Sequence, residues 1–152
     1  MLRDVRTLDR KIADLDGRIE AEVEASSTTL TEIFGIGPIL AATIIGTVGS
    51  VARFPTKAHF ASYAGTAPVE ASSGEKVRHR LSLAGNRHLN YALHMVAVCQ
   101  ARSDARGGAY YRKKIVEGKS RKEALRCLKR RVSDAVFASL VADSQVLSRS
   151  AA

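Results

Sequence analysis

The sequence predicts an all-α protein: an N-terminal helix, a helix-hairpin-helix and a small helical bundle interrupted by one long loop. Apolar residues recur at spacings of three and four near both ends of the chain, which is the helical period. A turn of small residues, Gly35-Ile36-Gly37-Pro38, separates two short helical segments between them. Residues 66–85 show neither a sustained helical nor a strand period, and we expect a loop there.

Composition and charge favour a single compact domain that binds a polyanion. The chain has 152 residues, 45% apolar content and a net charge of +9. Between Lys76 and Arg131 the sequence holds sixteen Lys or Arg and only three acidic residues. No apolar run approaches the roughly 18 residues of a membrane span, and no secretory signal is present, so we expect a cytoplasmic protein.

The first 25 residues have the pattern of a short coiled-coil helix. Its apolar seam alternates spacings of three and four, with charged residues elsewhere, and consists of Val5, Leu8, Ile12, Leu15 and Ile19. Acidic residues outnumber basic ones up to Glu24, so this helix is not an anion-binding arm. Two interpretations are open: a helix that dimerises, and a helix that packs on its own domain.

Residues 29–48 have the pattern of a helix-hairpin-helix. Thr29 and Glu32 have the S/T-x-x-E spacing of a capping box, which predicts the start of a short helix. Gly35 and Gly37 permit a tight turn, and Pro38 suits the first position of the next helix. The turn amides could hold a backbone phosphate; packing alone is the other interpretation.

The expected loop at 66–85 carries Ser72 and Ser73 beside a glycine, followed by Lys76, Arg78 and Arg80. A serine that attacks a phosphodiester needs an open position and positive charge to hold the phosphate. The loop could supply both, and the alternative is a flexible basic loop without chemistry.

The pattern of residues 86–143 predicts basic helices. Arg87 lies near the start of the first, and Ser120 with Glu123 forms a second capping box that begins the last. We expect a cationic outer face on the last helix, for nucleic-acid contact or as a solvated surface, made by Arg121, Lys122, Arg126, Lys129 and Arg130. Residues 144–152 are expected to form a flexible tail.

No metal site is predicted in this chain. Cys99 and Cys127 lack a CxxC partner, and His88 and His94 do not have the spacing of a zinc pair on a helix.

The order of short motifs resembles the C-terminal transposase domain of the insertion-sequence-110 type, a family of mobile-element recombinases guided by a bridge RNA. The motifs are Gly35-Ile36-Gly37-Pro38, Arg53-Phe54, Ala61 to Pro68, Ser72-Ser73-Gly74, Arg80-Leu81-Ser82, Gly85-Asn86-Arg87 and Leu89. The resemblance covers nearly the whole chain, because the family also has a coiled-coil arm before this domain.

The resemblance implies a mechanism. A serine of the domain attacks the DNA backbone to give a phosphoserine intermediate, and the matching residue is Ser73, with Ser72 as the alternative. Lys76, Arg78, Arg80 and Arg87 would neutralise phosphates. The basic helices would bind DNA or a structured guide RNA. A dimer, or a tetramer, would form through the N-terminal helix.

Two departures from the family pattern affect this hypothesis. Leu83 and Ala84 stand where the family has basic residues. The family's RuvC-like domain, whose acidic quartet holds Mg²⁺, has no counterpart in these residues, so we expect no cofactor in this chain and no recombination by it alone. The alternative function is a non-catalytic nucleic-acid-binding or dimerisation module from a truncated element. A scaffold for an acidic partner is a third.

Overall fold

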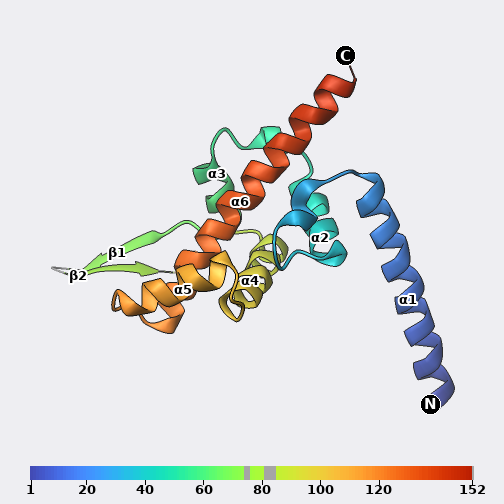
Figure 1. Cartoon of the computed structure of the whole chain (residues 1–152), viewed down its shortest axis with the longest axis horizontal. Coiled ribbons are helices and arrows are strands. Elements are labelled where there is room, and N and C mark those ends of the chain that lie inside the picture. Colours follow the sequence, from blue (N-terminus) through green and yellow to red (C-terminus); the bar gives the residue numbers. More distant parts are fainter. Residues whose placement is uncertain (74–75, 81–84, 152) are drawn as a thin grey trace.

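A computed structural model describes residues 1–73, 76–80 and 85–151 and confirms the all-α class. In chain order the elements are α1 (Leu2–Ala25), η1 (Thr29–Glu32), α2 (Pro38–Val48), η2 (Val51–Arg53), α3 (Lys57–Tyr63), β1 (Val69–Ser73), β2 (Lys76–Arg80), α4 (Arg87–Ala101), α5 (Arg106–Val116) and α6 (Arg121–Ser150), where η1 and η2 are 3-10 helices. Figure 1 shows α6 running through the middle of the molecule, with α1 and the β1–β2 hairpin projecting from different sides.

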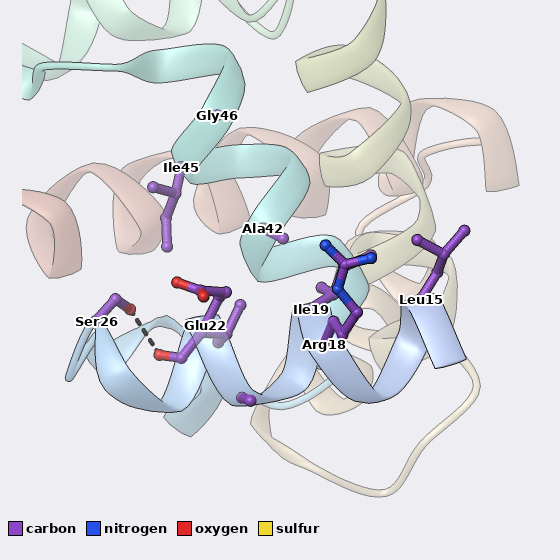
Figure 2. Close-up of a pocket in the computed structure, with 10 residues that line it drawn as sticks. Leu15, Arg18, Ile19, Glu22, Ser26, Ala42, Ile45 and Gly46 are labelled. Atoms are coloured by element: carbon purple, nitrogen blue, oxygen red, sulfur yellow. Dashed lines mark hydrogen bonds between the residues drawn. The ribbon is translucent and has the colours of Figure 1, made fainter. Parts of the chain in front are cut away.

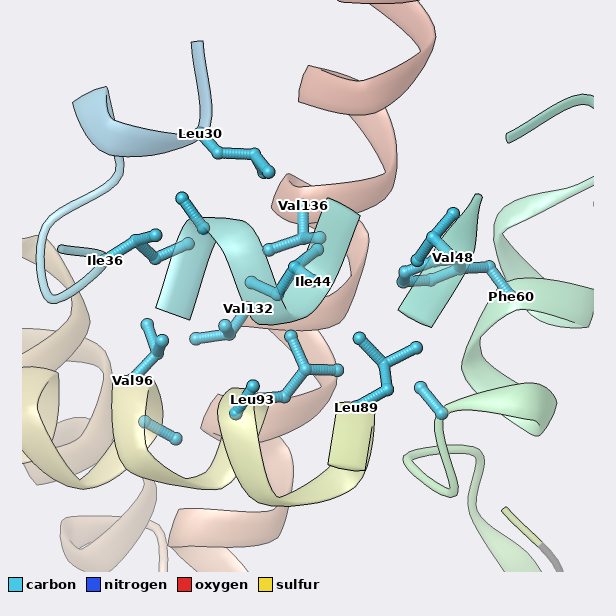
Figure 3. Packing of buried hydrophobic residues seen from close by; sticks show 14 of the residues in the cluster. Leu30, Ile36, Ile44, Val48, Phe60, Leu89, Leu93, Val96, Val132 and Val136 are labelled. Carbon is cyan, nitrogen blue, oxygen red and sulfur yellow. The ribbon is translucent and has the colours of Figure 1, made fainter. Parts of the chain in front are cut away.

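The hydrophobic core lies where α2, α4 and α6 meet. Ile44 of α2, Leu93 of α4 and Val136 of α6 are fully buried there, as Figure 3 shows. The spacings of three and four between Leu89, Leu93 and Val96 place these side chains on one face of α4. This core fixes the positions of the helices from which the hairpin extends.

Helix α1 packs on the core only near its C-terminal end. Ile19 and Val23 contact the core cluster, whereas Leu8 and Ile12 are 58% and 57% exposed. A groove of about 510 Å³ lies between α1 and α2. Ile19 of α1 and Ile45 of α2 are among the residues that line it (Figure 2). We call residues 1–18 the arm and the remaining described residues the body.

Asp143 of α6 binds the segment that connects α1 to α2. This carboxylate accepts hydrogen bonds from the Thr28 hydroxyl (2.7 Å), the Thr29 hydroxyl (2.7 Å) and the Thr29 amide. The prediction that Thr29 and Glu32 form a capping box is therefore wrong. Thr28 caps a 3-10 helix instead, and the Thr29 hydroxyl is used by Asp143.

Helix α6 begins as predicted and continues further than predicted. Its capping box is confirmed: the Ser120 hydroxyl accepts from the Glu123 amide, and the Glu123 carboxylate accepts from the Ser120 amide. The helix then continues to Ser150, through most of the expected tail at 144–152. No glycine or proline in residues 144–150 ends it.

The region expected to be a loop contains an antiparallel β-hairpin. Strands β1 and β2 pair with Ser73 opposite Lys76 and Val69 opposite Arg80. The signal that the prediction overlooked is the pair Gly74-Glu75 between two five-residue segments, because a Gly-x pair is typical of two-residue hairpin connections. These two residues, and Leu81 to Ala84, lie outside the described residues.

Among the described residues, no helix combines the length and the apolar character that crossing a lipid bilayer requires.

Candidate functional site

The hairpin places the two candidate serines opposite a cationic strand. In the backbone register Ser73 faces Lys76, Ser72 faces Val77 and Ala71 faces Arg78. Directly opposed residues of antiparallel strands have Cβ atoms about 4.5–5.5 Å apart. Three of the predicted phosphate-binding residues, Lys76, Arg78 and Arg80, belong to this strand.

The residues on either side of the hairpin, 63–65 and 85–86, form what we call its root. Hydrogen bonds from Asn86 and from α4 join the two sides. The Asn86 amide donates to the Tyr63 carbonyl (2.7 Å), and the Asn86 side chain donates to the Tyr63 hydroxyl (3.2 Å). Asn90 Nδ2 donates to the carbonyls of Ala64 (2.8 Å) and Gly65 (3.2 Å). Gly85 lies so close to Gly65 that a Cβ at Gly85 would overlap the Gly65 backbone. The two ends of the segment that carries the hairpin are thus held together.

Lys129 supports this root and is not part of an exposed cationic face, which corrects the sequence prediction. The side chain is 6% exposed, and its Nζ donates to Asn90 Oδ1 at 2.7 Å. The position is internal because spacings of four and three connect Leu125, Lys129 and Val132, so Lys129 follows the apolar seam of α6. Burial lowers the pKa of Lys129.

The positive charge of Lys129 affects the pKa of His94 on the neighbouring helix α4. Burial, and secondarily the positive charge of Lys129, lower the pKa of His94 below its usual value of 6.5. Ser133, one turn beyond Lys129, is fully buried, and its hydroxyl has no hydrogen-bond partner within the described residues. The interface of α4 and α6 therefore contains a polar cluster within an otherwise apolar core.

The glycine turn before α2 divides into a packed half and an open half. Gly35 has a φ of +92°, and a Cβ there would contact Cys99 and Val96 of α4. Gly37 caps α2, and a Cβ there would meet no atom within 4 Å. Gly37 is thus exposed at the start of α2, whereas Gly35 packs against α4.

Three of the predicted cations are exposed in the first turns of helices. Arg87 begins α4, and Arg121 and Lys122 begin α6. A cation is unfavourable at a helix N-terminus because the helix dipole is positive there. Their positions suit an external anion better than the fold itself. Arg130, by contrast, forms an ion pair with Asp134 at 3.1 Å and is only partly exposed.

Tyr110, which the sequence does not mark as a site residue, lies between two cations. Arg131 of α6 lies over the Tyr110 ring at 4.3 Å from its centroid, and Lys114 lies at 5.5 Å. The spacing of four between Tyr110 and Lys114 is a local signal for the second contact, whereas nothing in α5 indicates the first, because Arg131 belongs to α6.

In the part of the chain that the structure describes, no three His, Cys, Asp or Glu side chains come together as metal ligands.

The structure thus defines a helical protein with a cationic surface and a hairpin that presents serines opposite basic residues. The sequence matches the model of the transposase IS116/IS110/IS902 family over residues 27–112, and the chain belongs to this family.

Curated relatives come from several insertion elements. An uncharacterized 43.6 kDa protein of insertion element IS110 from Streptomyces coelicolor is 37% identical over 83% of this chain and 32% of its own length. An uncharacterized 44.8 kDa protein of IS116 from Streptomyces clavuligerus is 30% identical over 88% of this chain and 34% of its length. A probable family 20 transposase from Pseudomonas aeruginosa is 32% identical over 68% of this chain. The chain spans about a third of the length of these relatives.

Proposed function

We propose that this chain acts in DNA transposition as the part of a transposase that binds DNA and supplies a serine nucleophile. The observation that carries the proposal is the register of the hairpin, in which Ser72 and Ser73 pair with the strand that contains Lys76 and Arg78. Membership of the transposase family supports DNA as the substrate.

In the proposed reaction the hydroxyl oxygen of Ser73 attacks phosphorus of a backbone phosphodiester. A phosphoserine bond forms, the bond from phosphorus to one sugar oxygen breaks, and that oxygen leaves as a hydroxyl. Lys76, Arg78 and Arg80 would neutralise the charge that accumulates on the phosphate, which is the largest electrostatic demand of the step. Mg²⁺ would be held by an acidic RuvC-like domain outside these 152 residues. The chain alone is accordingly proposed to be inactive.

The exposed cations would hold the remainder of the nucleic acid. Arg87, Arg121 and Lys122 are placed for backbone phosphates of DNA or of a structured guide RNA, and Gly37 offers the amides at the start of α2. A second copy of the chain would cover the exposed seam of α1 and give a dimer, or a tetramer through further contacts.

The decisive experiment compares Ser73→Ala with Ser72→Ala in the transposase that contains both the acidic domain and this chain. The two serines differ in register by one residue, so each is the matched control for the other. We expect Ser73→Ala to abolish covalent capture of DNA, detected on denaturing gels, while DNA binding stays within about twofold. Ser72→Ala should keep most of the capture.

If Ser72→Ala abolishes covalent capture and Ser73→Ala does not, the nucleophile is Ser72. Full capture by both variants would contradict the serine mechanism. It would favour the second candidate function, a non-catalytic nucleic-acid-binding or dimerisation module, which the exposed α1 seam and the exposed cations of α4 and α6 would also serve.

A further inference from the structure

Arg53 is an exposed cation that the structure holds in one orientation. Its guanidinium lies 5.3 Å from the ring centroid of Phe54 and 5.2 Å from that of Tyr63. Its Nη1 also donates a hydrogen bond to the Val48 carbonyl at the end of α2 (3.1 Å). A long side chain normally loses rotamer freedom when it binds a ligand, and these contacts have already removed much of that freedom.

The rings beneath Arg53 are themselves fixed. Phe54 is buried and packs edge-on against Phe60 at 5.3 Å, and the Phe54 and Tyr63 centroids are 5.1 Å apart. A guanidinium over an aromatic ring is weakly hydrated, yet the N–H donors in the plane of the guanidinium can still bind a planar or bidentate acceptor. Four of the five N–H donors of Arg53 have no partner within the described residues, since the structure gives it only the bond to Val48.

The segment of the chain that carries Arg53 has no acidic residue of its own. The sequence from Ile33 to Pro68 contains no Asp or Glu, and Arg53 forms no ion pair within the described residues. An exposed arginine that only covers an aromatic cluster does not require an acid-free segment. A group that binds an anion benefits from it.

Arg53 is also connected to the root of the hairpin. Tyr63, on which its guanidinium stacks, accepts a hydrogen bond from Asn86 and so joins the α4 end of the root. An anion bound at Arg53 would therefore lie on the surface from which the hairpin extends.

We propose that Arg53 is a phosphate-binding residue, which binds a backbone phosphodiester of the nucleic acid next to the one at the serine hairpin. The stack on Phe54 and Tyr63 orients the guanidinium before the ligand arrives. This inference rests on the proposed nucleic-acid binding and adds to it a contact on η2, outside the hairpin and the basic helices.

The test measures affinity and salt dependence for a labelled duplex DNA and, separately, a labelled single-stranded RNA. Arg53→Gln should weaken binding of at least one polymer about tenfold and lower its salt slope by about 1. Lys11→Gln is the matched control, because Lys11 is an exposed cation of the arm, where acidic residues outnumber basic ones, and it should change the affinity less than about twofold.

Equal losses in the two variants would overturn the proposal, because they would show that only net charge matters. Failure of the unmodified chain to bind either polymer would overturn the nucleic-acid function as a whole. These two failures are distinguishable, since the second is seen before any substitution is made.

A second measurement covers the case in which Arg53→Gln fails to fold. The unmodified chain is treated with phenylglyoxal, which modifies arginine side chains, in the presence and in the absence of DNA or RNA. Mass spectrometry of the peptides then gives the rate of modification at each arginine. Nucleic acid should slow modification of Arg53 at least about fivefold, as expected for a guanidinium engaged in charge-assisted hydrogen bonds. An unchanged rate at Arg53 would overturn the proposal.

Discussion

The two long helices α1 and α6 have similar apolar seams but different surroundings. On α6, Leu128 and Val136 are 1% and 0% exposed, and α3, α4 and α5 pack along this helix. On the arm, Leu8 and Leu15 are 58% and 50% exposed. A seam with spacings of three and four thus specifies a helix face that should be covered, but it does not specify by what.

The difference predicts that the same substitution has different consequences in the two helices. Leu128→Ala should lower the free energy of unfolding by about 3 kcal/mol, because it removes buried methyl groups and leaves a cavity in the core. Leu8→Ala should change it by about 0.5 kcal/mol or less in the monomer. Urea denaturation at a protein concentration where sedimentation shows monomers measures both.

Similar losses in the two variants would mean that the arm folds back onto the body of the same chain. The comparison would then no longer hold, and a second copy would not be needed to cover the arm.

Replacing glycine by alanine should change the stability of the body and of the arm in opposite directions. Gly85→Ala should destabilise the body by about 2 kcal/mol, because the new Cβ overlaps the Gly65 backbone at the hairpin root. Gly17→Ala should stabilise the arm by about 0.5–1 kcal/mol, since a Cβ there meets no atom within 4 Å and alanine favours the helix. Thermal unfolding followed by circular dichroism measures both.

A destabilising Gly17→Ala would indicate a close neighbour at the arm that the isolated chain does not show, such as a second copy. A neutral Gly85→Ala would show that the hairpin root can open.

Charges on the arm seam test whether a second copy covers it. The double variant Leu8→Glu, Ile12→Glu should weaken dimerisation at least about tenfold, because association would bury carboxylates in an apolar interface. Analytical ultracentrifugation measures the dissociation constant. Arg10→Gln and Asp14→Asn, at positions of the same helix away from the seam, form the control and should leave it within about twofold. A dimer that survives the double variant would place the interface elsewhere.

Much of the fold followed from the sequence because helical periods are local. The core of α4, the capping box of α6 and the helical class depend on residues three or four apart. The prediction was wrong about Thr29 because its hydroxyl binds Asp143, which lies far away in the chain. No local pattern contains that partner.

The candidate site was less predictable for the same reason. The sequence predicts Lys129 among the cations of the outer face, whereas the structure buries it beside its acceptor Asn90 of α4. The stack of Arg53 on Tyr63 is likewise formed across a turn. The hairpin, by contrast, had a local signal in Gly74-Glu75, and the assignment of the serine to Ser73 or Ser72 stays a prediction.

The smallest expected effect concerns the electrostatics of the body interior. Lys129→Met should raise the pKa of His94 toward 6.5 without restoring it, because the substitution removes the positive charge but leaves the larger cause, burial, in place. Lys11→Met, which removes an exposed cation of the arm, should leave the pKa of His94 unchanged. Titration of the histidine ring protons by NMR measures both.

The same shift has a consequence for stability. The pKa of His94 is lower in the folded than in the unfolded chain, so the unfolded state binds more protons between the two values. Stability is therefore lost as the pH falls from about 6.5 through the folded pKa, and the loss should be smaller in Lys129→Met. Equal His94 titrations in the unmodified chain and in Lys129→Met would contradict the coupling. The positive charge buried between α4 and α6 would then be screened from the histidine, and the body interior would resemble the solvated arm in its electrostatics.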